Sequence, residues 1–496
     1  MLDILVCVKQ VPDINLVKMD PVTGSLIRAG VPAILNPHDA NALEAAVQVK
    51  ERYGGMVTAI TMGPDAAAEA LRECMASGAD RAVLLSDRAF ANADTLATSY
   101  VIATAAQRLE SFELIFCGKE SLDGATGQMA SQLAERFDAS QLSCVLSIED
   151  IDLDCRKVTA LRELERGVER TRASLPCLIT VEKANFRPRI PNLARWKASR
   201  TAEILPHQGT AHLSARGGRA RHDDRRGQSR QERSKAGLAP GRGALKGVPQ
   251  MLDKSMYRDM WVYIEQEAGQ ALPVSLELCC EARKLCDAAG EKLAAVVVGS
   301  LPEAELAKIR ACGVDAILTV SGTGYEYPNV DAWAALFTKL CEERRPSAVL
   351  VGGTIFGRDF APRFACRLGT GCTSDATELV YDEKTGCIEF VEPAVGGRLM
   401  AVITVPEARP QVGTIRPGTF KLSPAGERPC ALEELRVDFP VSEIRTEILG
   451  FEREALDESL NIADAEAIVC VGNGIKGAES LGRYRRLAEL LGGKLA

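Results

Sequence analysis

Two stretches of this sequence, Leu71-Arg-Glu-Cys-Met-Ala-Ser-Gly-Ala-Asp80 and Leu306-Ala-Lys-Ile-Arg-Ala-Cys-Gly-Val-Asp315, decide its fold because they follow one pattern. Both look like the end of a helix followed by a glycine and an aspartate. Their glycines, Gly78 and Gly313, stand 235 positions apart. A pattern that returns after a long interval predicts two structural units of the same kind.

The same interval separates Gly118 and Gly353, each of which ends a short apolar run. Around these glycines, each unit reads as strand, helix, strand, helix and strand. The opening strand and helix of the two units are Ile4–Val8 with Ala40–Arg52 and Trp261–Ile264 with Ser275–Ala289. Apolar strands that alternate with amphipathic helices predict a parallel sheet covered on both faces, so we expect two α/β domains of similar topology.

Composition agrees with a large globular chain. With 496 residues, of which 46% are hydrophobic and 26% charged, the chain has material for two or three cores. A net charge of −7 and 5% aromatic residues argue against a dedicated nucleic-acid binder. No apolar run is long enough to span a membrane, and the first residues lack the features of a signal peptide. We therefore expect a cytoplasmic protein.

The 16 cysteines are scattered and none form a Cys-x-x-Cys pair, so we expect reduced, buried thiols and no metal or iron–sulfur site. Acidic residues offer no catalytic pair either. Glu163 and Glu165 lie on a predicted edge segment and show no spacing typical of an acid–base pair. Histidine is nearly absent from the folded parts, so the sequence shows no nucleophile with a histidine as its base.

The segment between the units has a different composition. Residues 205–250 carry a net charge of +7, which leaves −14 for the rest, and contain few large aliphatic residues. This predicts a disordered, basic, low-complexity linker, with a tether to nucleic acid or a membrane surface as the alternative. After the second unit, an acidic connector at 447–463 precedes a strand, a glycine turn (Gly472-Asn-Gly-Ile-Lys-Gly477) and a helix, which would begin a third α/β unit.

Three strand–helix junctions of the first unit are candidate binding elements. The loop from Gly118 to Gln128 combines small residues, a threonine hydroxyl and a helix start, which suits a phosphate. Asn36–Asp39 and Ala91–Thr98 also open helices, although an aspartate in the place of Asp94 is more often a helix cap than a ligand contact, and a histidine in the place of His38 is more often capping or exposed than catalytic. Because ligands of parallel sheets lie beyond the carboxyl ends of the strands, one ligand could touch all three junctions. Their candidate residues are Asn36, Pro37, His38, Asp39, Asp94, Thr95, Thr98, Gly118, Asp123, Gly124, Ala125, Thr126, Gly127 and Gln128.

Several longer motifs make the chain resemble an electron-transfer flavoprotein. They are Val8–Asp13, Asp20–Leu26, Ser86–Phe90, Leu161–Glu169, Gly357–Arg363, Thr370–Thr377, Gly396–Met400 and Arg409–Gly418. The resemblance implies a beta subunit (1–204) fused through the linker to the first domain of an alpha subunit (251–446). Both would be Rossmann-like domains of the adenine-nucleotide-hydrolase type. Residues 464–496 would be the truncated start of the alpha FAD domain.

The resemblance also implies an adenine nucleotide in the beta half, held by Cys7, Met62 and the junction residues above. It would be AMP in ordinary members and a second FAD, reduced by NADH, in the electron-bifurcating branch. The stretch Ser86–Thr98 resembles that branch more closely and favours FAD. Arg358, Arg363 or Arg367 would approach the flavin ring, where a guanidinium stabilises the reduced anion, unless these arginines form ion pairs instead.

Ile190, Pro191, Asn192 and Leu193 match the loop with which the family docks on acyl-CoA dehydrogenases. Together these features predict an electron carrier that passes electrons between NADH, a beta-side FAD and an acyl-CoA dehydrogenase, impaired by the truncated FAD domain. The alternatives are a non-catalytic AMP-binding scaffold that docks a dehydrogenase, and a remnant with neither activity.

Overall fold

The computed structural model describes residues 2–206 and 253–496, except 14–15, 17, 20–25, 28–29, 166, 184, 326, 395–396, 398, 425, 427, 454–461, 463–464, 466, 473 and 476. The predicted linker therefore lies outside the described residues, apart from Leu205 and Pro206. Parts of the motifs Asp20–Leu26, Leu161–Glu169, Gly396–Met400 and Gly472–Gly477, and of the acidic connector, also lie outside them.

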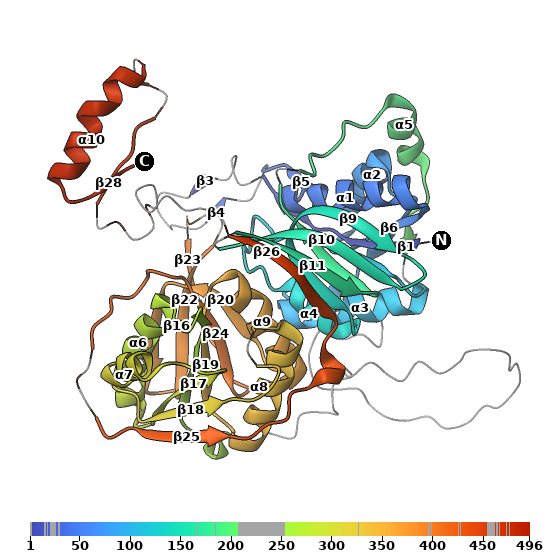
Figure 1. The fold of residues 1–496 in the computed structure, drawn as a ribbon. Coiled ribbons are helices and arrows are strands. Elements are labelled where there is room, and N and C mark those ends of the chain that lie inside the picture. Colours follow the sequence, from blue (N-terminus) through green and yellow to red (C-terminus); the bar gives the residue numbers. More distant parts are fainter. Residues whose placement is uncertain are drawn as a thin grey trace, which may run out of the picture.

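The first unit is built on a ten-stranded sheet (Figure 1). Its strands follow the spatial order β13 (Leu205–Pro206), β7 (Arg81–Leu85), β6 (Gly55–Met62), β1 (Leu2–Cys7), β8 (Leu114–Cys117), β12 (Cys177–Val181), β9 (Ser140–Asp152), β10 (Lys157–Leu164), β11 (Gly167–Ser174) and β26 (Thr446–Arg453). The strands from β13 to β9 are parallel, and the last three are antiparallel to their neighbours.

Both faces of the parallel part are covered by helices because successive strand residues point to opposite faces. In β1, Ile4 and Val6 pack into the core under α1 (Pro37–Tyr53) and α2 (Ala68–Ser77). Leu5 and Cys7 pack into the core under α3 (Thr95–Leu109) and α4 (Met129–Arg136). The continuous apolar strand predicted from the sequence therefore feeds two cores at once.

The second unit repeats this arrangement. Its seven strands follow the order β25 (Ala431–Leu435), β18 (Ala316–Val320), β17 (Leu293–Val298), β14 (Met260–Ile264), β19 (Ala348–Gly352), β24 (Gln411–Ile415) and β20 (Cys372–Ala376). All pair in parallel, and the two cores hold helices α6 (Pro273–Ala289), α7 (Glu303–Ala311), α8 (Val330–Arg344) and α9 (Ile355–Leu368). Strand for strand, this is the order of the first unit from β13 to β9, which confirms the predicted fold class.

Smaller elements complete the chain. They are α5 (Leu193–Thr201), the pairs β2 (Gln10–Pro12) with β5 (Ala33–Leu35), β3 (Lys18–Met19) with β4 (Leu26–Ile27) and β15 (Gln266–Glu267) with β16 (Gln270–Ala271), the sheet of β21 (Glu378–Asp382), β22 (Cys387–Ala394) and β23 (Leu399–Ile403), and the C-terminal group β27 (Ile468–Val469), α10 (Leu481–Leu490) and β28 (Lys494–Leu495).

Three details differ from the sequence-based expectations. Leu205 and Pro206, assigned to the linker, pair with β7 as β13. The start of the acidic connector forms β26, which pairs with β11, so chain from beyond the second unit completes the sheet of the first. Because β9 and β11 flank β10 on its two sides, the strand that carries Glu163 is interior and not an edge.

No helix within the described residues is long and apolar enough to cross a membrane. All sixteen cysteines are free, and twelve of them are buried, as expected for reduced thiols. In the described part of the chain no group of histidine, cysteine or acidic side chains is arranged to hold a metal ion.

Candidate functional site

The candidate site lies where β1 and β8 end and α1 begins. Asp39, in the first turn of α1, is 6% exposed and accepts hydrogen bonds from the backbone N–H groups of Lys9 (2.7 Å) and Gly118 (3.1 Å). Burial raises the pKa of the Asp39 carboxyl to about 7, although these hydrogen bonds act in the opposite direction. Position 118 requires a glycine, since a Cβ there would lie 2.2 Å from Asp39 Oδ1.

The loop that follows Gly118 is held in place by Asn36, which is fully buried. Its Nδ2 donates to the Glu120 carbonyl (2.8 Å), and its Oδ1 accepts from the Leu122 N–H (3.3 Å). Asp123 then pairs with Lys9 at 2.8 Å. Burial acts to raise the pKa of Asp123, but the Lys9 ammonium and the hydrogen bonds from Lys9, Ser121 and the Gly124 N–H together lower it. The loop is thus held by Asn36 and Lys9, and these contacts leave the N–H groups of Thr126 and Gly127 unused.

The start of α4, at the end of this loop, is open. Gln128 stands at the N-cap position but makes no side-chain cap hydrogen bond. Within the described residues, the N–H groups of Thr126, Gly127 and Met129 have no protein acceptor. Ala125 and Gly127 have positive φ angles, which turn the loop sharply before the helix. Free N–H groups at a helix start, with the helix dipole behind them, form a cradle for a phosphate.

The third junction has a different character. Asp94 caps α3 by accepting from the Ala97 N–H (2.8 Å), which is the cap role weighed in the sequence. Thr95 donates to Gln128 Oε1 (2.9 Å), so this junction is tied to the loop before α4. Thr98 lies on the first turn of α3 and is partly buried. The structure therefore brings Asp94, Thr95 and Thr98 to the same end of the sheet as the phosphate cradle.

Cys7, Cys117, Met62 and His38 complete the candidate site. Cys7 and Cys117 are partners in the register between β1 and β8, and both are buried at the carboxyl ends of their strands. Met62 ends β6 beside them and is partly buried. His38, on the first turn of α1, is partly buried as well, and burial lowers the pKa of its imidazole. Its neighbour Pro37 is the first residue of α1.

The second unit reaches this site through Arg358 and Arg416. Arg358 Nη2 donates to Asp375 (2.8 Å) and its Nε donates to the Gly353 carbonyl (3.0 Å). Arg416 also binds Asp375, with 3.0 Å between Nε and Oδ2. This hydrogen bond raises the pKa of Arg416, and the charge of Glu120 on the first unit's loop adds a smaller effect in the same direction. Both guanidinium groups are partly exposed. The two guanidinium groups thus share the Asp375 carboxylate, and Arg416 is the one close enough to the loop to feel the charge of Glu120.

Arg363 and Arg367 occupy a different place. Arg363 is 2% exposed and pairs with Glu135 (3.3 Å) and Asp331 (2.9 Å), and Arg367 pairs with Glu135 at 2.7 Å. The Glu135 contacts join α9 to α4, and the Asp331 contact joins α9 to α8. Both arginines thus form ion pairs, the alternative to a flavin contact, but the pairs are buried and not on the surface as that alternative had them. Gln128 also joins the units, since its Nε2 donates to the Cys372 carbonyl (2.6 Å) and to Ser374 Oγ (2.7 Å).

The equivalent position in the second unit is closed. There α9 begins directly after Gly353, and Thr354 caps it by accepting from the Gly357 N–H (2.9 Å). Glu165, from the turn between β10 and β11 of the first unit, accepts a hydrogen bond from the Ile355 N–H. In the second unit a carboxylate thus occupies the helix start whose counterpart in the first unit is open.

The predicted docking loop protrudes from the first unit. Ile190 is 93% exposed and Leu193 66% exposed, and Asn192 caps α5 by accepting from the Arg195 N–H (2.8 Å). Pro191 lies between them and lines a hollow beside α2. Arg189 fixes the base of the loop by pairing with Glu44 (2.8 Å) and Glu51 (2.6 Å) of α1.

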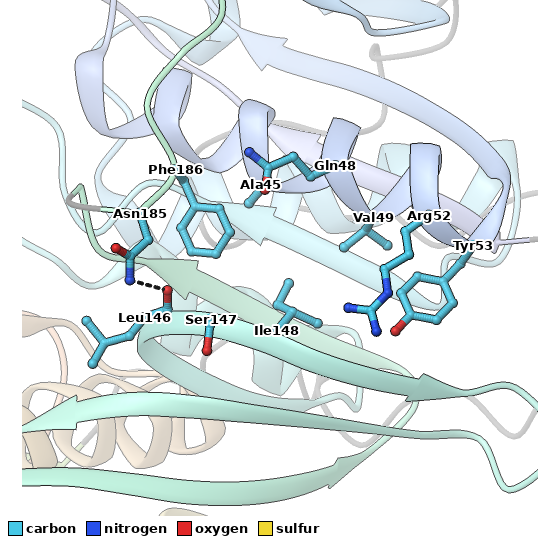
Figure 2. Close-up of a pocket in the computed structure, with 10 residues that line it drawn as sticks. All are labelled: Ala45, Gln48, Val49, Arg52, Tyr53, Leu146, Ser147, Ile148, Asn185 and Phe186. Atoms are coloured by element: carbon cyan, nitrogen blue, oxygen red, sulfur yellow. Dashed lines mark hydrogen bonds between the residues drawn. The ribbon is translucent and has the colours of Figure 1, made fainter.

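A separate hollow of about 230 Å³ lies between α1 and β9 and is shown in Figure 2. Asn185 and Phe186 form one wall, and Asn185 Nδ2 donates to the Leu146 carbonyl (2.7 Å). None of its ten lining residues is a candidate nucleotide contact. The candidate site is thus an open end of the sheet and not this hollow.

Sequence reasoning missed the roles of Arg416, Glu165 and Gln128 between the units. Arg416 directly follows β24, so its position after an apolar strand of the second unit was a usable signal. Glu165 and Gln128 gave no such signal, because their partners lie in the other unit.

Comparisons with known proteins agree with this geometry. The family model described as "Electron transfer flavoprotein domain" matches residues 23–207 and 260–440, one match in each unit. Among curated proteins, the chain is 50% identical over 187 residues to "Caffeyl-CoA reductase-Etf complex subunit CarD" of Acetobacterium woodii, covering 38% of this chain and 70% of that protein. It is 43% identical over 206 residues to "Protein FixA" of Azorhizobium caulinodans (41% and 73%). It is 46% identical over 192 residues to "Electron transfer flavoprotein subunit beta" of Thermoanaerobacterium thermosaccharolyticum (39% and 72%).

Proposed function

Since the chain belongs to the electron transfer flavoprotein family, we propose that it binds FAD at the open end of the first unit and carries electrons from NADH to an acyl-CoA dehydrogenase. The first unit would correspond to a beta subunit and the second to the first domain of an alpha subunit. The observation that carries the proposal is the uncapped start of α4, with free N–H groups facing the end of the sheet.

The residues present fit a nucleotide of this kind. Thr126, Gly127 and Met129 would hold phosphate oxygens through their N–H groups, and Asp39 and Asn36 keep the loop in place. Arg358 and Arg416 would supply positive charge from the second unit. Bound flavin would supply the hydride-accepting chemistry that a carrier between NADH and a dehydrogenase needs.

The role of the protein is then to orient and polarise the bound cofactor. The Asp375 carboxylate fixes two guanidinium groups, so positive charge is placed before the cofactor arrives. Gln128 ties the loop to Ser374 across the boundary between the units, which keeps both walls of the site in register. Ile190 and Leu193 would contact the dehydrogenase, because large apolar side chains this exposed are typical of binding surfaces.

The test is the identity of the bound nucleotide. The protein is purified without added cofactor, its ligand is released with acid, and the ligand is identified by absorbance and chromatography. About one FAD per chain, with anaerobic bleaching by NADH, supports the proposal. AMP alone would contradict it and would favour a non-catalytic AMP-binding scaffold that docks a dehydrogenase.

A further inference from the structure

A second hollow lies beside the docking loop. It has a volume of about 320 Å³ and lies between α2, α5 and the β2–β5 pair. Pro191 and Trp196, from the docking loop and α5, form part of its wall. Any protein that contacts Ile190 and Leu193 must therefore pass close to its mouth.

Three of the four charged residues that line this hollow are paired. Arg200 binds Glu69 at 2.8 Å and lies over the Trp196 ring at 4.9 Å. Arg72 lies 3.6 Å from Glu69 and donates to the carbonyls of Ser199 (2.9 Å) and Arg200 (3.1 Å) at the end of α5. These contacts hold α5 against α2, and the Glu69 carboxylate is paired with both arginines.

The fourth, Glu73, has no partner among the described residues. It lies one turn after Glu69 on α2, and burial of its carboxyl group raises its pKa. Glu73 is exposed at the mouth of the hollow, so its carboxylate can pair with a cation brought by another molecule, and the pair leaves water only when that molecule covers it. The hollow in Figure 2 differs, because its charged residue, Arg52, already lies over the Tyr53 ring at 5.0 Å.

We propose that the dehydrogenase partner inserts a lysine or arginine side chain into this hollow, where it pairs with Glu73 while its neighbouring apolar residues cover Ile190 and Leu193. The inference rests on the proposed function, since it concerns the same docking surface. An apolar contact alone would leave the partner free to rotate about the loop, whereas a charge pair beside it fixes one orientation. Glu73 is thus a specificity residue for the partner.

The test measures the Kd between the full chain and a purified acyl-CoA dehydrogenase on a biosensor surface. Glu73→Gln should weaken binding about tenfold, mainly through faster dissociation, and Glu73→Lys should weaken it further. Glu383→Gln and Glu383→Lys, at an exposed acid on the turn between β21 and β22, are the matched controls and should leave Kd unchanged. Because Glu73 is exposed and unpaired, its variants should keep the circular dichroism and nucleotide content of the wild type.

The outcomes separate the inference from the function it rests on. If Leu193→Asp abolishes binding but both Glu73 variants bind within twofold of the wild type, the docking surface stands and the charge pair is refuted. If the wild type does not bind the dehydrogenase, or Leu193→Asp binds as well as the wild type, the proposed docking fails and the inference falls with it.

Discussion

Replacing Glu265 by glutamine should change how the stability of the second unit depends on pH. Glu265 follows β14, is 7% exposed and accepts a hydrogen bond from Thr354 Oγ1 at 2.7 Å. Burial raises the pKa of its carboxyl from 4.5 to about 8, and the nearby charge of Glu165 adds to this effect. Glutamine keeps an oxygen for the Thr354 bond but cannot ionise.

The direction of the pH effect on stability depends on whether the folded or the unfolded state holds the proton on Glu265. Between about pH 4.5 and pH 8 the folded protein keeps a proton on Glu265 that the unfolded chain has lost, so stability falls as pH rises. One proton corresponds to about 1.4 kcal/mol per pH unit. Across the whole window, Glu265 would cost the folded state roughly 5 kcal/mol, and Glu265→Gln removes that cost. Below the window the difference between the two proteins should be constant.

Urea unfolding followed by tryptophan fluorescence suits this measurement. Trp261 and Trp333 are buried in the second unit, at 3% and 1% exposure, whereas Trp196 of the first unit is 46% exposed and should change little. The difference in unfolding free energy between variant and wild type should grow steadily from about pH 5 to pH 8. Glu383→Gln controls for the loss of one carboxylate from the same unit. A difference that stays constant over this range would refute the argument.

Three further changes test the site and the contact between the units. Thr126→Glu places a carboxylate in the phosphate cradle and should abolish nucleotide binding, measured as cofactor content. Ser111→Glu adds the same charge before β8 and should leave the cofactor content unchanged. Wild-type content in Thr126→Glu would contradict the assignment of the loop. Gly118→Ala places a Cβ 2.2 Å from Asp39 Oδ1 and should weaken nucleotide binding about tenfold. At Gly124 the nearest atom to an added Cβ is 3.5 Å away, so Gly124→Ala should bind the nucleotide as the wild type does. Equal nucleotide affinities of the two variants would show that the contact between position 118 and Asp39 does not matter for binding. Arg363→Ala leaves Glu135 and Asp331 buried with less compensation and should lower the free energy of unfolding by about 3–5 kcal/mol, and a loss below about 1 kcal/mol would show that the pair is not needed.

The order of elements could be predicted because it depends on local signals. Gly118 and Gly353 end equivalent strands, β8 and β19, so the repeat in the sequence gave the repeat in the fold. The loop before α4 was recognisable for the same reason, since small residues and a helix start are local features.

Contacts between the units could not be predicted in this way. Arg358, Arg363 and Arg367 all lie on α9, but only the packing of α9 against α4 decides which of them turn inward. Arg363 and Arg367 are one turn apart and share Glu135, whereas Arg358 lies on another side of the helix, towards Asp375. Likewise nothing local shows that β11 has a further neighbour, because its partner β26 comes from beyond the second unit.

Strand β26 also bears on how the two units find each other. Its pairing with residues 167–173 of β11 is a contact between parts of one polypeptide, so its formation is governed by an effective local concentration and not by the amount of protein present. For a short flexible connection that effective concentration is on the order of millimolar. Units joined in this way should therefore remain assembled at dilutions where two separate chains of equal intrinsic affinity would drift apart.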